Sequence, residues 1–353
     1  MPQPFDLLGA SFDQAVRRIA FTTSKRRQGR SAEGLGPLER KRILKELAHA
    51  FREPEYFEEP DTFFSSSPLS SVDGPAVDAE DVRAFQSGRV VDLSWPSDYA
   101  PVCDEIAESY QAHPGNQRAH GRAFFHAEPR PAVILIHGYL GGVHAFEERL
   151  WPLDWLFRKG LDPVLFVLPF HGLRSTGRAR FPGPDLRVTI DGFRQSIHDL
   201  RSLVTYLLHR GAPAVGVMGM SLGGYTSALL STVEPRLSFV VPFIPLASIA
   251  DFIREGDRLV GTRSQRTEQH QLLEDAHAVV SPLHRPCLTA PAGRLVVGAH
   301  GDRITPPGHA ERLAEHLEAP LEMFRGGHIL QLGRSKGFRA VGKMLGGLGL
   351  LED

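Results

Sequence analysis

The sequence predicts an α/β fold in which a mostly parallel sheet carries helices on both faces. The chain has 353 residues and is 42% apolar, which is enough to bury a large core. From about residue 88, short apolar runs alternate with helical stretches, as in strands linked by crossover helices. We expect eight strands, at Arg89–Leu93, Ala119–Phe125, Ala132–Ile136, Pro163–Leu168, Ala214–Met218, Phe239–Phe243, Leu295–Ala299 and Leu321–Phe324. Helices are expected around 144–159, 188–209, 223–232, 307–317 and 335–345.

Residues 1–85 differ from the rest and predict an N-terminal helical extension that ends in a linker. Two sets of apolar residues each share a helical face: Leu8, Phe12, Ala15, Val16, Ile19 and Ala20 in the first, and Leu44, Leu47, Ala48 and Phe51 in the second. The serine-rich stretch Ser65–Ser71 predicts a linker or surface loop. We therefore expect an extension over residues 1–85 and an α/β domain over residues 86–353.

Composition excludes several classes of function. A formal net charge of −1 argues against a nucleic-acid-binding surface and against a polybasic membrane-binding surface. The two cysteines, Cys103 and Cys287, lack the spacing of a metal-ligand pair and predict two reduced thiols. The first residues do not resemble a signal peptide, and no uncharged apolar run approaches 18 residues. We expect a cytoplasmic protein without an integral membrane segment.

A short glycine-rich motif, Gly219-Met220-Ser221-Leu222-Gly223, directly follows the predicted strand Ala214–Met218. The residues after it, beginning with Gly223-Gly224, read as a helix that starts with small side chains. A serine between a buried strand and a helix occupies a sharp, strained turn, where larger neighbours would collide with the strand and the helix. The motif therefore predicts an exposed nucleophilic serine at position 221, rather than one more serine in a glycine-rich loop.

Three other motifs each lie at the end of a predicted strand. His137-Gly138 precedes Ser221, and Gly301–Pro307 and Gly326-Gly327-His328 come after it. With the motif at Ser221, they make residues 88–350 resemble the α/β-hydrolases, and within that superfamily the abhydrolase-domain or dienelactone-hydrolase-like serine hydrolases. The resemblance implies an α/β-hydrolase fold with a mostly parallel eight-stranded sheet. It also implies a nucleophile, acid and base in the chain order Ser221, Asp302, His328.

The chemistry needs these residue types. A serine hydroxyl becomes nucleophilic when an imidazole accepts its proton, and a carboxylate on the other ring nitrogen fixes the tautomer and stabilises the imidazolium. The carboxyl ends of parallel strands share one edge of a sheet, so Ser221, Asp302 and His328 can meet there. Backbone N–H groups of Tyr139 and Leu222 are expected to form the oxyanion hole.

The sequence leaves alternatives for the acid and the base. Asp251, in the segment after the sixth predicted strand, competes with Asp302 as the acid. His171 and His300 compete with His328 as the base. His137 is expected to organise the loop of the oxyanion hole instead of acting as the base.

Substrate-binding residues are less defined by the sequence. Leu140 is expected to border the site beside Tyr139. Arg174, in the turn after the fourth predicted strand, is either a cation that binds a substrate carboxylate or phosphate, or a partner in a structural ion pair. Residues 248–282 lie where α/β-hydrolases insert caps, and predict a short cap with an apolar helical face.

The sequence thus predicts a serine hydrolase that cleaves a carboxylic ester or related acyl bond of a small molecule through an acyl-enzyme, without cofactor or metal. A peptidase or acyltransferase with the same triad is the first alternative. A non-catalytic binding protein with this fold is the second. The substrate and the oligomeric state do not follow from the sequence.

Overall fold

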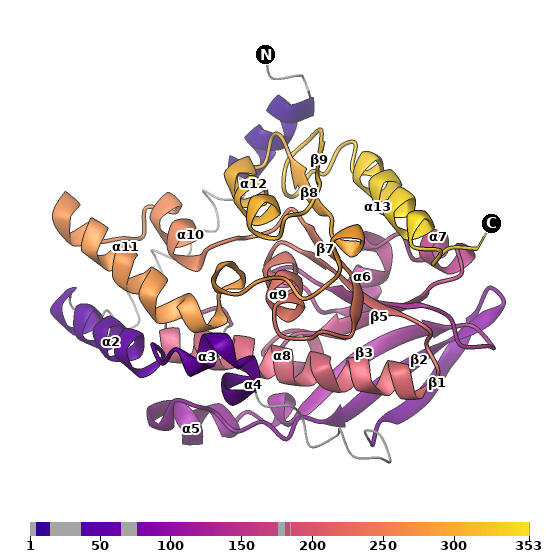
Figure 1. The fold of residues 1–353 in the computed structure, drawn as a ribbon, viewed down its shortest axis with the longest axis horizontal. Helices are drawn as coiled ribbons and strands as arrows, with labels where there is room; N and C mark the ends of the chain where they lie inside the picture. The colour runs from indigo at the N-terminus through magenta and orange to yellow at the C-terminus, as the bar shows by residue number, and fades with distance from the viewer. Residues whose placement is uncertain (1–4, 15–36, 65–75, 176–180, 184, 353) are drawn as a thin grey trace.

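A single mixed sheet organises the described part of the chain, which in this computed structural model comprises residues 5–14, 37–64, 76–175, 181–183 and 185–352. Its nine strands follow the order β1-β2-β3-β5-β4-β6-β7-β8-β9 (Figure 1). The first four strands of that order pair antiparallel, and the strands from β5 to β9 pair parallel. The strands are β1 Asp78–Phe85, β2 Gly88–Pro96, β3 Arg118–Phe125, β4 Ala132–Ile136, β5 Asp162–Val167, β6 Val215–Met220, β7 Leu237–Phe243, β8 Val296–Ala299 and β9 Leu321–Phe324.

The helices follow the strands as crossover connections require. They are α2 Pro37–Ala50, α3 Glu55–Glu58, α4 Pro60–Phe63, α5 Asp104–Gln111, α6 His144–Leu150, α7 Leu153–Arg158, α8 Leu186–His209, α9 Leu222–Ser231, α10 Ile249–Glu255, α11 Arg263–His277, α12 Pro307–His316 and α13 Ser335–Gly347. Residues 5–14 are also helical. None of the described helices combines the length and the apolar composition that a membrane crossing requires.

Two apolar cores lie on opposite faces of the sheet. Ile134 and Ile136 of β4 pack into a core with side chains of α8, α9 and α12. Val133 and Leu135 of the same strand pack into a second core with side chains of α7 and α13. Because neighbouring residues of a strand point to opposite faces, a continuous apolar run such as Ala132–Ile136 indicates a strand that is covered on both sides. The predicted layers are therefore confirmed.

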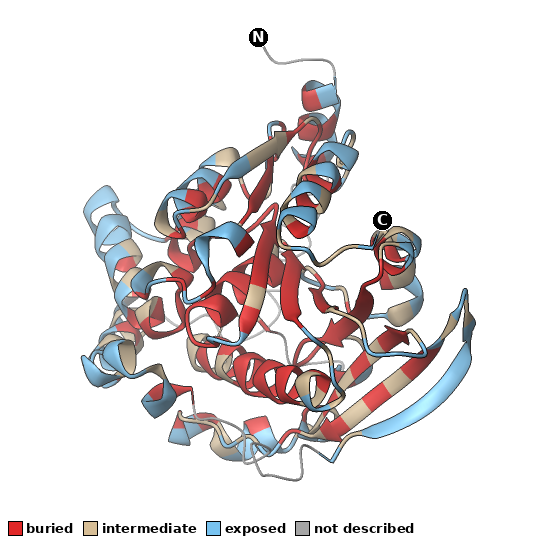
Figure 2. Cartoon of the chain, turned by 45° about the vertical axis from the view of Figure 1, so that its right-hand side comes forward, coloured by how far each residue is buried: buried red, intermediate tan, exposed pale blue. Residues whose placement is uncertain are grey.

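All eight predicted strands are present, and the sheet has one more at its edge than the sequence predicts. β1 pairs antiparallel with β2. Seven of its eight residues are exposed, and its sequence DAEDVRAF shows no apolar alternation (Figure 2). A strand that buries neither face leaves no hydrophobic periodicity to detect, which is why the count of eight was wrong. β1 lies within the segment that the sequence assigns to the N-terminal extension.

The N-terminal extension packs on the sheet domain. Leu44 and Leu47 of α2, and Phe51 directly after it, belong to the core on the side of α8 and α9. α2 runs beside α11, where Lys41 and Glu268 form an ion pair at 2.6 Å (Figure 1). The serine-rich linker at Ser65–Ser71 and the later residues of the first predicted apolar face lie outside the described residues.

Strand order places a topological switch point between β4 and β6, because the chain leaves β4 toward β5 and later returns on its other side to form β6. Ligands of open α/β sheets bind at such a point, outside the carboxyl ends of the strands. Ile136, at the end of β4, is paired with Gly219 of β6. The predicted oxyanion loop and Ser221 therefore emerge from the sheet side by side.

Candidate active site

Ser221 lies on a strained turn between β6 and α9. Its backbone has φ 56° and ψ −110°, a conformation that side-chain-bearing residues rarely adopt. The turn is kept tight by glycines: a Cβ on Gly219 would lie 1.9 Å from the Gly223 carbonyl oxygen, and one on Gly223 would lie 2.1 Å from that of Ile136. The predicted strand–turn–helix context of Ser221 is present. The contact of the Ser221 hydroxyl with His328 remains a prediction.

The loop after β4 approaches Ser221 and is fixed by its own polar contacts. A Cβ on Gly138 would lie 3.5 Å from the Ser221 Cβ, so the loop passes directly over the serine. Glu147 of α6 accepts a hydrogen bond from the Gly142 N–H at 3.0 Å. Burial raises the pKa of Glu147, which has almost no exposed surface. Glu147 could not be predicted from the sequence, because its partner is a backbone group in a loop of irregular geometry.

His137 organises this loop, as the sequence predicts. Its Nε2 accepts a hydrogen bond from the Leu168 N–H at 3.1 Å, so Nδ1 carries the proton and donates to the Gly138 carbonyl oxygen at 2.7 Å. Burial, with a smaller effect of neighbouring His171, lowers the pKa of His137 to about 3. Both ring nitrogens are occupied, which leaves no nitrogen to accept a proton from Ser221.

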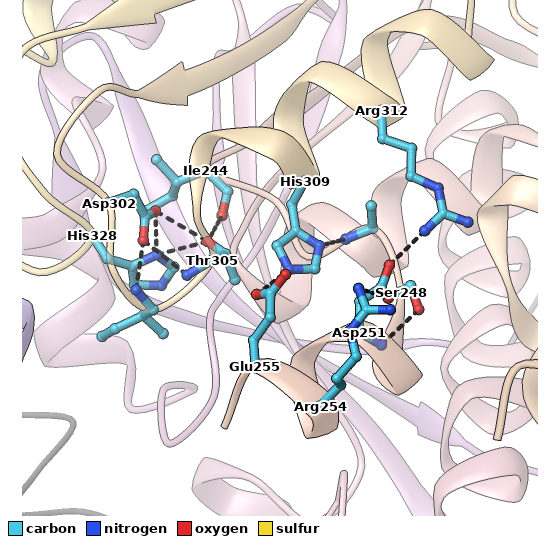
Figure 3. Close-up of polar contacts among 12 residues, drawn as sticks. Ile244, Ser248, Asp251, Arg254, Glu255, Asp302, Thr305, His309, Arg312 and His328 are labelled. Carbon is cyan, nitrogen blue, oxygen red and sulfur yellow. Dashed lines mark hydrogen bonds and ion pairs between the residues drawn. The ribbon is translucent and has the colours of Figure 1, made fainter. Parts of the chain in front are cut away.

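Asp302 and His328 form a buried pair. The His328 Nδ1 lies 2.7 Å from Asp302 Oδ2 (Figure 3). Asp302 Oδ1 accepts the N–H groups of Ile304 and Thr305 at 2.9 and 2.8 Å, which fixes the carboxylate in its loop after β8. With Nδ1 directed at the carboxylate, Nε2 is left free to act as a base.

Thr305 contacts both members of this pair, and its role was not predicted from the sequence. Its hydroxyl lies 3.0 Å from both Asp302 Oδ2 and His328 Nδ1, and 3.2 Å from the Ile244 carbonyl oxygen after β7. The hydroxyl therefore links three loops. A threonine three residues after the acid in the Gly301–Pro307 motif was the available signal.

The electrostatics of His328 combine opposing effects. Burial lowers its pKa, whereas the charge and hydrogen bond of Asp302, and then the charge of Asp13, raise it. The net result is a pKa above the usual value of 6.5.

The competing acid Asp251 lies in a different cluster (Figure 3). Its carboxylate contacts Arg254 at 2.6 Å, Arg312 at 2.5 Å and His270 at 2.8 Å. Asp251, His270 and Glu274 also place potential metal-ligand atoms within 4.8 Å of one another. Since two guanidinium groups already balance the Asp251 charge, the cluster is explained by ion pairs, and we assign no metal to it.

The other histidine candidates lie apart from the Asp302 carboxylate. His171 is buried and its Nδ1 lies 2.8 Å from the Pro169 carbonyl oxygen. The His300 side chain is exposed at the end of β8. Of the predicted candidates for the base, the structure brings His328 alone into contact with Asp302 among the described residues.

Arg174 is enclosed within the fold. Its side chain is fully buried and lies 2.8 Å from Asp199 of α8, which is also fully buried. Of the two interpretations that the sequence leaves open, the structure favours the ion pair, because the guanidinium has no surface left for a substrate.

Exposed apolar side chains surround the candidate site. Tyr139 and Leu140 are 46% and 77% exposed, and Ile329, next to His328, is 49% exposed. Val143 and Phe146, later in the same connection after β4, are also exposed. The turn containing Leu173 packs on this loop, since a Cβ on Gly172 would lie 2.0 Å from the Gly142 carbonyl oxygen.

The predicted cap residues form α10 and α11. The two cysteines are buried and form no disulfide.

Comparison with known proteins finds no family model that matches the chain. Two uncharacterized proteins of Mycobacterium tuberculosis are each 29% identical to it over 234 residues, which are 63% of this chain and 55% of each relative. The chain thus spans about half the length of the curated relatives it matches.

Two solved structures resemble this one over most of their length. The acetyl xylan esterase from Paenibacillus sp. R4 has a TM-score of 0.58 and 17% identity, over 84% of this chain and 95% of that one. Acetyl xylan esterase 1 from Thermoanaerobacterium sp. JW/SL YS485 has a TM-score of 0.55 and 17% identity, over 82% and 93%. At this level of identity the likeness concerns the fold. Together with the strand order and the strained turn at Ser221, it shows that this protein has the α/β-hydrolase fold.

Proposed function

We propose that this protein is a serine hydrolase that cleaves a carboxylic ester or related acyl bond through an acyl-enzyme. Ser221 is the nucleophile, His328 the general base and Asp302 the acid that orients it. The observation that carries the proposal is the 2.7 Å contact between His328 Nδ1 and Asp302, on loops at the same sheet edge as the strained Ser221. The two structural neighbours are acetyl xylan esterases, which supports the choice of an ester as the acyl donor.

The proposed reaction has two stages. Ser221 Oγ attacks the ester carbonyl carbon while its proton moves to His328 Nε2, and the tetrahedral oxyanion accepts hydrogen bonds from the Tyr139 and Leu222 N–H groups. Leu222 is the first residue of α9, so its N–H has no partner within the helix. The ester C–O bond then breaks, and the alcohol leaves with the proton from His328.

Water completes the cycle. It attacks the acyl carbon while His328 Nε2 accepts one of its protons, and the Ser221 ester bond breaks. His328 returns the proton to Ser221 Oγ, and the carboxylic acid leaves. Asp302 keeps the imidazole in the required tautomer and stabilises its cationic form in both stages.

A fluorophosphonate probe tests the proposal, because phosphorus is trapped by a serine that a base activates beside oxyanion donors. We expect labelling of the purified full chain at Ser221, located by mass spectrometry, and its loss in Ser221→Ala. Labelling that persists in Ser221→Ala would overturn the nucleophile. An unreactive wild-type protein would favour the non-catalytic binding protein. A parallel panel of esters, thioesters and peptides separates esterase from peptidase activity.

A further inference from the structure

The helical segment 5–14 lies against the loops that carry Asp302 and His328, at the carboxyl ends of β8 and β9 (Figure 1). The contact is close enough to require glycine on both sides. A Cβ on Gly9 would lie 2.2 Å from the Gly327 nitrogen, and one on Gly301 would lie 2.4 Å from the Asp6 carbonyl oxygen. Asp6 also pairs with Arg325 at 2.7 Å. The N-terminal segment is therefore built into the wall behind the candidate site.

Asp13 makes the central contact of this segment. It has no exposed surface, and its Oδ2 accepts the His328 N–H at 2.6 Å and the Arg303 N–H at 3.1 Å. Its Oδ1 accepts the Ile329 N–H at 2.9 Å. One buried carboxylate thus bridges the backbone of the acid loop after β8 and the backbone of the base loop after β9. Such charge-assisted hydrogen bonds are roughly twice as strong as neutral ones.

We propose that Asp13 is a positioning residue that holds the His328 loop against the Asp302 loop, so that the N-terminal segment completes the active site. The inference rests on the proposed function. The acceptor for the backbone N–H of His328 thus comes from a segment that lies some 300 residues earlier in the chain. Asp13 does not touch the reacting atoms and acts through the position and charge state of His328.

The charge of Asp13 gives the proposal a specific signature. The charged groups that act on His328 are the carboxylates of Asp302 and Asp13. The elements packed nearby also carry the Asp6–Arg325 pair, the exposed Arg303, and the Glu255–His309 contact between α10 and α12. Asp13 contributes to the raised pKa of His328, because a negative charge nearby favours the imidazolium. Removing that charge must lower the pKa, so the neutral base persists to lower pH.

Asp13→Asn tests both effects, since an amide keeps the size but places N–H donors against backbone N–H groups. We expect kcat for a p-nitrophenyl ester to fall about 10- to 100-fold with little change in KM. The acid limb of the kcat/KM profile should move to lower pH. Asp13→Glu keeps the charge and should leave the acid limb near that of the wild type. Asp6→Asn, in the same segment but in contact with Arg325, controls for weaker docking and should not move the limb.

A readout without turnover separates this inference from the proposed function. The His328 imidazole can be titrated by NMR, with its resonance assigned by its loss in His328→Gln, and thermal unfolding checks that each variant is folded. A lower His328 pKa in Asp13→Asn than in Asp6→Asn supports the proposal even if no ester is hydrolysed. Equal pKa values and equal kcat in the two variants would overturn it. A wild type that does not label at Ser221 contradicts the proposed function alone.

Discussion

Arg174 and Asp199 form an ion pair at 2.8 Å in which neither side chain has exposed surface. The guanidinium also donates to the carbonyl oxygens of Val167 and Asn116, at 3.3 and 3.2 Å, and Asp199 accepts from the Ser97 hydroxyl at 2.6 Å. The pair therefore fastens the turn after β5 to α8.

Arg174→Ala should lower the free energy of unfolding by about 3–5 kcal/mol, because it leaves the Asp199 charge buried without its partner. Arg187→Ala is the matched control: Arg187 pairs with Asp185 at 3.0 Å in a partly exposed position, and its loss should cost less than about 1 kcal/mol. Urea unfolding measures both. A stable Arg174→Ala variant that loses activity toward carboxylate-bearing esters would instead indicate that Arg174 binds the substrate.

The pH dependence of activity should follow His328. Its neutral form is the base, so kcat/KM should rise with pH through the His328 pKa, and the midpoint of this acid limb should lie above pH 6.5. A pH–rate profile on an uncharged ester measures it, with Ser221→Ala as the background. A midpoint at or below pH 6.5 in folded protein would show that burial outweighs the Asp302 and Asp13 charges.

The two candidate acids can be separated by amide substitutions. Asp302→Asn should lower kcat by about 10⁴-fold, since the amide favours the wrong tautomer of His328 while the fold is retained. Asp251→Asn should change kcat little, because Asp251 contacts Arg254, Arg312 and His270. Steady-state kinetics with circular dichroism checks both variants. The reverse order of effects would transfer the acid to α10.

The turn at Ser221 should not accept a methyl group at Gly219. A Cβ there would lie 1.9 Å from a backbone carbonyl oxygen, so Gly219→Ala must displace the turn, and we expect a lower melting temperature and loss of probe labelling. Gly346→Ala in α13 is the control, because a Cβ there meets nothing within 4 Å. It should be neutral or stabilising, by about 0.5–1 kcal/mol. A fully active Gly219→Ala variant would contradict the close packing of the turn.

The exposed apolar rim predicts a preference among acyl groups. Each methylene buried against side chains such as Tyr139 and Leu140 adds about 0.8 kcal/mol, or about fourfold in kcat/KM. On p-nitrophenyl esters we expect kcat/KM to rise from acetate to at least butyrate, and uncharged acyl groups to exceed those ending in a carboxylate. A flat or falling series would argue against an apolar acyl site and would favour an acetyl-specific one.

Features that show in a short stretch of sequence could be predicted, whereas contacts between residues far apart in the chain could not. Strands β2 to β9 were predicted from short stretches with apolar residues beside turn residues. Ser221, Asp302 and His328 were predicted as site residues because each follows such a strand. Thr305 and Glu147 were missed because their roles depend on loop geometry. Asp13 gave no signal at all: its partners are backbone N–H groups some 300 residues away, which leave no trace in local sequence.

The exposed edge strand β1 has a consequence for how copies of this chain meet. Its outer side presents backbone groups that could serve as a template for another chain, but Asp78, Glu80, Asp81 and Arg83 line it with charge. Behind it, β2 carries the buried side chains Val90, Val91, Leu93 and Trp95. Were β1 removed, this apolar strand would become the open edge and invite aggregation through intermolecular strand pairing. The exposed, charged strand β1 thus covers the edge of the apolar strand β2.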